Sequence, residues 1–226
     1  MSQQFLKHIQ LGATAEVADA VASDPSLLFW RDPQGVSALL WSIYFGQPLV
    51  RDFLQFQLAQ AGVALDAFEA AALGDTPRLA QALEASPEAI HDRTGDGWTA
   101  LHLAAAFGTP EAVQILLQKG ADVAAISHNA QKNQPLHAVL ALGRNPETLR
   151  LLLDAGADPN ARQTAGFTAI FSAAAANRRD LAELLIAHGA DSSLTNDFGQ
   201  TAAGFARERN HTEIANWLES LPSPTT

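Results

Sequence analysis

The sequence has no cysteine, one methionine and one tyrosine, and only 7% of its residues are aromatic. Without cysteine, disulfides and thiolate chemistry are excluded. Basic residues are also scarce, because 14 Lys and Arg face 24 Asp and Glu, for a net charge of −10. A protein that binds nucleic acid or an anionic membrane surface needs a basic footprint. We therefore expect neither nucleic acid nor a membrane among its partners.

Long apolar runs are missing as well. Residues 1–17 contain no apolar segment of the kind found in secretory signal peptides. No stretch approaches the ~18 uncharged apolar residues that a membrane span requires. We therefore expect a cytoplasmic protein, and the Ala-rich, Cys-free composition is compatible with a bacterial origin.

Three segments of the chain align with one another. They begin at Gly97, Asn133 and Gly166, and each ends in Gly-Ala-Asp. The Gly of that triplet stands at positions 120, 156 and 189, so the spacings are 36 and 33 residues. A period near 33 is typical of one class of helical array, in which single units cannot bury their own apolar faces.

A second periodic mark is a Gly or Asn that ends a short helix. It occurs at Gly12, Gly46, Gly74, Gly108, Gly143, Asn177 and Asn210. A helix that turns directly into an antiparallel partner needs a left-handed residue, and Gly and Asn adopt that conformation most readily. We therefore expect a left-handed residue at all seven positions.

The units predict seven helix pairs, beginning near Phe5, Ala38, Asp66, Ala100, Pro135, Ala169 and Ala202. In the unit at Gly97, Thr99 is the expected N-cap of a helix over 100–107. Pro110 suits the first turn of a second helix over 110–119.

The first third of the chain is a degenerate copy. Residues 12–39 align without a gap on residues 74–101. The spacing of 28 residues between Gly46 and Gly74 leaves little room for a projecting loop, so we expect a gap there. We predict one domain over 1–220, with degenerate repeats in 3–65, regular repeats in 66–201, a C-terminal cap in 202–220 and a flexible tail in 221–226.

These motifs resemble ankyrin repeats. Residues 97–102 (GWTALH), 134–137 (QPLH) and 156–161 (GADPNA) are similar to that family's G-x-T-P-L-H start and G-A-D-x-N-A end. The resemblance implies an all-α solenoid of about seven helix-turn-helix repeats with hairpin-like fingers. It also implies a concave groove that binds proteins, and local hydrogen-bonding roles for His102 and His137. Phe171 and Gly204 depart from the motif His.

The candidate binding residues lie at variable positions of the repeat. The apolar candidates are Trp98, Phe167, Phe107, Leu142, Tyr44 and Phe45, and the charged candidates at the fingers are Asp96, Arg93, Lys132 and Arg162. Aromatic side chains exposed in one groove are typical of interface hot spots. The alternative is that these rings pack against their own finger or the adjacent repeat, and that the polar residues are solvated.

The sequence contains no recognisable catalytic motif. The G-x-S-x-G, P-loop and G-x-G-x-x-G patterns are absent, and no His pair has the spacing of a zinc helix. We therefore expect no enzyme activity, no metal and no cofactor. The leading hypothesis is a monomeric interaction module that binds one protein partner. The alternatives are a delivered bacterial effector or stress-protective factor that acts by binding, and, more remotely, an enzyme with a cryptic site.

Overall fold

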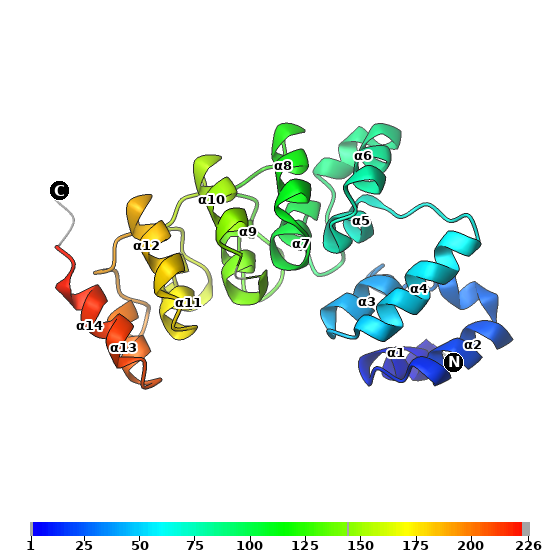
Figure 1. The fold of residues 1–226 in the computed structure, drawn as a ribbon, viewed down its shortest axis with the longest axis horizontal. Helices are drawn as coiled ribbons and strands as arrows, with labels where there is room; N and C mark the ends of the chain where they lie inside the picture. The colour runs from blue at the N-terminus through cyan, green and yellow to red at the C-terminus, as the bar shows by residue number, and fades with distance from the viewer. Residues whose placement is uncertain (1, 144, 223–226) are drawn as a thin grey trace.

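The computed structural model describes residues 2–143 and 145–222. Within them the chain forms fourteen α-helices in seven antiparallel pairs, which stack side by side in an elongated row (Figure 1). None of these helices is long and apolar enough to cross a lipid bilayer. The core is continuous along the row, from Phe5 to Leu218, so every pair is stabilised by its neighbours.

We call the first helix of each pair the inner helix and the second the outer helix. The inner helices are α1 (Ser2–Gln10), α3 (Ala38–Tyr44), α5 (Ala67–Leu73), α7 (Ala100–Phe107), α9 (Pro135–Ala138), α11 (Ala169–Ala175) and α13 (Ala202–Arg207). The outer helices are α2 (Thr14–Ser23), α4 (Pro48–Gln60), α6 (Thr76–Ala85), α8 (Pro110–Gln118), α10 (Pro146–Asp154), α12 (Arg179–Ala187) and α14 (Thr212–Ser220).

Capping residues and prolines begin these helices at the positions that the sequence predicts. Thr99 caps α7 and accepts a hydrogen bond from the backbone N–H of His102, while Pro110 occupies the first turn of α8. The degenerate copy is real, because α2 and the 3-10 helix η1 (Pro25–Phe29) recur as α6 and η2 (Pro87–Ile90).

Five of the seven predicted left-handed residues are confirmed. Gly12, Gly46, Gly74, Asn177 and Asn210 have φ values of 67°, 64°, 67°, 52° and 63°. These residues let each inner helix turn straight into its outer helix.

Gly108 differs from the prediction, and for Gly143 the left-handed conformation stays a prediction. Gly108 has φ of −82°, and it is glycine for a steric reason: a Cβ there would lie 2.3 Å from the carbonyl oxygen of Ala71. Gly143 is the last residue of a π-helical turn, η3 (Val139–Gly143), which extends the short helix α9. The close approach of the neighbouring helix therefore requires glycine at position 108, and a left-handed turn does not.

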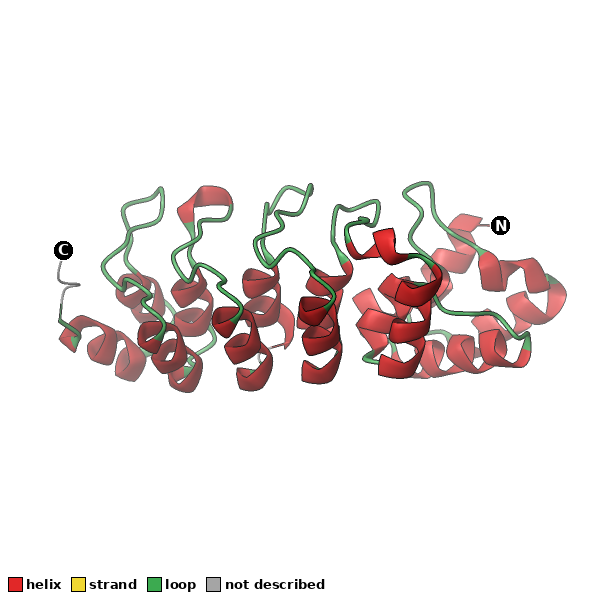
Figure 2. Ribbon diagram, turned by 90° about the horizontal axis from the view of Figure 1, so that it is seen from above, coloured by secondary structure: helices red, strands yellow, loops and turns green. Residues whose placement is uncertain are grey.

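Hairpin-like loops, here called fingers, project from one side of the row (Figure 2). Finger 1 is residues 30–37, finger 2 is 91–99, finger 3 is 126–134, finger 4 is 161–168 and finger 5 is 194–201, each leading into an inner helix. A short connection over 61–66 stands where another finger would precede α5, as the 28-residue spacing predicts.

His102 and His137 tie neighbouring repeats together. The Nδ1 atom of His102 accepts a hydrogen bond from the backbone N–H of Thr99, so its Nε2–H donates to the carbonyl oxygen of Asn133 on the next finger, 3.1 Å away. His137 repeats the arrangement with Gln134 and Ala161. Burial lowers the pKa of both imidazoles, that of His102 to about 4.

The last repeat has a polar outer surface. Arg207 pairs with Glu219 and donates to the side-chain oxygen of Asn216. Arg207 and Glu219 stand where the preceding repeat has Ala174 and Ile186, and a polar surface at this place is typical of a terminal repeat. Of the expected tail, residues 223–226 lie outside the described residues.

Candidate partner-binding surface

The inner helices and the fingers together form the inner face of the stack. On its N-terminal half, five aromatic side chains make one connected group, Trp41, Tyr44, Phe45, Trp98 and Phe107, which we call the N-terminal aromatic cluster. The Trp41 ring stacks on Phe45 at 5.1 Å between centroids, and Tyr44 contacts Phe107 at 5.7 Å. Four of the five side chains are half-buried, whereas Trp98 is only 8% exposed.

The missing finger explains why this cluster exists. Because 61–66 is short, finger 2 approaches finger 1 directly, and a Cβ on Gly95 would lie 2.0 Å from the carbonyl oxygen of Gln34. Rings from α3, finger 2 and α7 then meet over α5. Of the two alternatives for Trp98, the structure therefore shows packing: its ring lies between Tyr44 and Phe107, with centroids 6.4 and 6.1 Å away.

A second group, the C-terminal aromatic cluster, contains Phe167, Phe171 and Phe205. Phe167 is half-buried, with both other rings 5.2 Å away. Phe171 stands where the motif has His, so the bond that His would make is missing, and the buried hydroxyl of Thr168 has no hydrogen-bond partner among the described residues. Arg209 lies 3.6 Å above the Phe205 ring. Phe167 is thus also largely a packing residue.

The finger arginines predicted as contact residues have hydrogen-bond partners within the stack. Arg93 donates from Nη1 to the carbonyl oxygen of Gly97 in its own finger and to that of Ile126 in the next, at 3.1 and 2.7 Å. Arg162 makes the equivalent two contacts in fingers 4 and 5. Both side chains brace adjacent fingers, a role that the recurrence of Arg four residues before the finger Gly could have revealed.

The remaining predicted residues differ in accessibility. Leu142, in the π-helical turn, is 53% exposed, and Lys132 is exposed at the tip of finger 3. Asp96 is half-buried and accepts a hydrogen bond from the Thr94 hydroxyl. Among the apolar candidates, Leu142 is therefore the one that a partner could bury without any rearrangement of the fold.

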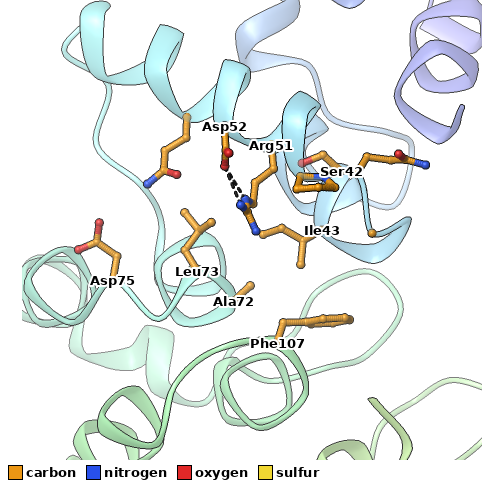
Figure 3. A pocket seen from close by; sticks show the side chains of 12 residues that line it. Ser42, Ile43, Arg51, Asp52, Ala72, Leu73, Asp75 and Phe107 are labelled. Atoms are coloured by element: carbon orange, nitrogen blue, oxygen red, sulfur yellow. Dashed lines mark hydrogen bonds and ion pairs between the residues drawn. The ribbon is translucent and has the colours of Figure 1, made fainter. Parts of the chain in front are cut away.

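Sequence reasoning missed a cleft of about 650 Å³ between the pairs α3–α4 and α5–α6 (Figure 3). Leu73, Ile43 and Phe107 line its apolar side. On its polar side Arg51 pairs with Asp52 at 2.7 Å, and both belong to α4. The irregular spacing before Gly74 was the available signal, because it marks the junction where the stack is least regular.

Comparison with known proteins identifies the family to which the observed repeat geometry corresponds. A family model described as "Ankyrin repeats (3 copies)" matches residues 67–163 and 137–222. The chain belongs to the ankyrin-repeat family. Ankyrin repeats are protein–protein interaction modules, and these matches cover all the repeats from α5 onward.

Curated relatives are similar over about half of the chain or more. They include the B-cell lymphoma 3 protein homolog of Mus musculus, 37% identical over 122 residues, and ankyrin repeat and SOCS box protein 16 of Mus musculus, 40% identical over 126 residues. The E3 ubiquitin-protein ligase KEG of Arabidopsis thaliana is 33% identical over 153 residues. The matches cover 54%, 53% and 66% of this chain but only 27%, 27% and 9% of those proteins.

Proposed function

We propose that this ankyrin-repeat protein is an interaction module that binds a protein partner along its inner face. The observation that supports the proposal is the half-buried aromatic surface of Trp41, Tyr44, Phe45 and Phe107, together with the exposed Leu142, which holds the repeat position of Phe107 in the next repeat. Aromatic side chains held rigidly by their neighbours add contact area with little further loss of conformational entropy on binding.

The choice of test residue follows from burial. Truncating Trp98 or Phe167 would leave a cavity and confound binding with stability. Leu142 is 53% exposed, so Leu142→Glu should leave the fold intact while placing a charge in the binding surface. Leu49 on α4 is 71% exposed on an outer helix, and Leu49→Glu is a matched control.

We expect wild type and Leu49→Glu to recover the same partner from native cell extract, and Leu142→Glu to lose most of it. Burying an unpaired charge in an interface costs about 2 kcal/mol or more, which is a loss of affinity greater than about tenfold. Quantitative mass spectrometry of the co-purified proteins measures the outcome. Recovery that fell only with Leu49→Glu would move the binding surface to the outer helices.

A further inference from the structure

A pocket of about 650 Å³ opens on the inner face where α1, finger 1 and α3 meet. Its walls are mainly apolar and include Leu6, Trp30 and Trp41. Both indoles are half-buried: Trp30 packs against Phe5, and Trp41 stacks on Phe45 of the N-terminal aromatic cluster. The pocket is therefore continuous with the surface proposed to bind the partner.

Asp32 lines this pocket and brings a negative charge into it. The residue is only 8% exposed, and its carboxylate accepts three hydrogen bonds. Oδ1 accepts from the backbone N–H groups of Gln34 and Val36, at 2.9 and 2.8 Å, and Oδ2 accepts from the indole of Trp41 at 3.0 Å. All three donors are neutral, and no basic side chain among the described residues forms an ion pair with Asp32. One lone-pair site of Oδ2 thus has no donor among the described residues.

Arg31 also lines the pocket, but its charge is already matched. Its Nη2 lies 2.9 Å from Oδ2 of Asp66 and 3.7 Å from Oε1 of Glu69, while Nη1 donates to the carbonyl oxygen of Gly35. Two carboxylates therefore face this one guanidinium, and none of the recorded ion pairs of Arg31 is with Asp32.

The negative electrostatic potential of Asp32 and Asp96 also acts on the N-terminal aromatic cluster. Burial raises the pKa of Tyr44, and the carboxylates of Asp96 and Asp32 raise it further. The two acids come from fingers 2 and 1, which the short connection 61–66 brings together. Aromatic rings under a negative potential attract cations, because the ring face is itself negative.

We infer that the partner segment bound here carries a Lys or Arg side chain that enters the pocket between Trp30 and Trp41 and pairs with Asp32, with Asp96 adding to the attraction. The inference rests on the proposed binding function of the inner face, and names the chemistry of the partner. An extended peptide with one basic residue among apolar residues matches the apolar walls, the acidic end and the adjoining aromatic surface.

The test selects random peptides of about twelve residues, displayed on phage, on immobilised full-length protein; extended, such peptides span roughly 40 Å. We expect the selected peptides to be enriched in Lys or Arg beside apolar residues, relative to the starting library. Replacing that basic residue by Gln should weaken binding at least about tenfold, and raising the salt concentration should weaken the parent peptide.

Two variants and one control test whether the basic peptide binds at this pocket. Asp32→Asn and Asp96→Asn should each weaken the basic peptide several-fold, whereas Asp197→Asn on finger 5 removes the same charge and should not. Asp32 also holds finger 1, and its replacement could unfold that finger. Among the described residues the Asp96 side chain accepts only the Thr94 hydroxyl, so Asp96→Asn tests the idea even if Asp32→Asn is poorly folded. Selected peptides without basic residues would overturn this inference and leave the inner face as a binding surface. Binding insensitive to Asp32→Asn, Asp96→Asn and Leu142→Glu would overturn both.

Discussion

Gly108→Ala should be among the most destabilising single substitutions in this protein, although it adds one methyl group. The new Cβ would lie 2.3 Å from the carbonyl oxygen of Ala71 and 3.0 Å from the Cα atom of Ala104. Both atoms belong to backbone, one in α5 and one in α7, so relief requires the two inner helices to separate. We expect a loss of about 3 kcal/mol, and a melting temperature lower by roughly 8 °C.

Gly46→Ala is the matched control. Gly46 has φ of 64°, but its Cβ would meet nothing within 4 Å. Only the left-handed conformation penalises the change, by about 1 kcal/mol. Urea or thermal unfolding of the two variants separates the causes. Equal losses would mean that backbone conformation, not the approach of α5 to α7, requires glycine at position 108.

Acidification from pH 7.5 to pH 5 should destabilise the fold, with His102 as a main contributor. Burial lowers the pKa of His102 from 6.5 to about 4, so the unfolded chain binds a proton in this range and the folded chain does not. Its contribution to stability is present in full above the unfolded pKa and is lost as the pH falls toward the folded pKa. The loss from this residue is about 2 kcal/mol at pH 5, and His137 acts in the same direction.

His102→Gln isolates this contribution. A Gln at the third position of the helix can still accept the backbone N–H of Thr99, but it does not titrate. Burial raises the pKa of Glu69, which has the opposite effect on the pH dependence, but Glu69 is common to both proteins and cancels in the difference. Urea midpoints measured from pH 7.5 to pH 4.5 should fall less steeply for the variant. Parallel curves would show that His102 is protonated in the folded state.

The family-wide features of the molecule could be predicted because they depend on short stretches of chain. The helix over 100–107 begins at a Thr cap, and Gly46 and Asn177 end helices because few other residues tolerate a positive φ. The 28-residue spacing before Gly74 correctly marked the missing finger. These local requirements act within one unit, so period and residue type are sufficient to recognise them.

Contacts between repeats could not be predicted from the sequence in the same way. Trp98 occupies a variable repeat position, yet it is buried because the short connection 61–66 lets Tyr44 reach it from α3. Arg93 was predicted as a contact residue, and only the structure shows that it also donates to the carbonyl oxygen of Ile126 in the next finger, 2.7 Å away.

The sequence by itself determined the ankyrin-repeat stack, since the period, the caps and most turn glycines act within one unit. Only the tertiary structure decided which side chains of the inner face pack internally and which, like Leu142, remain exposed. The physical reason is that burial depends on the spacing of neighbouring repeats. A shortened connection changes that spacing, and no single repeat encodes the result.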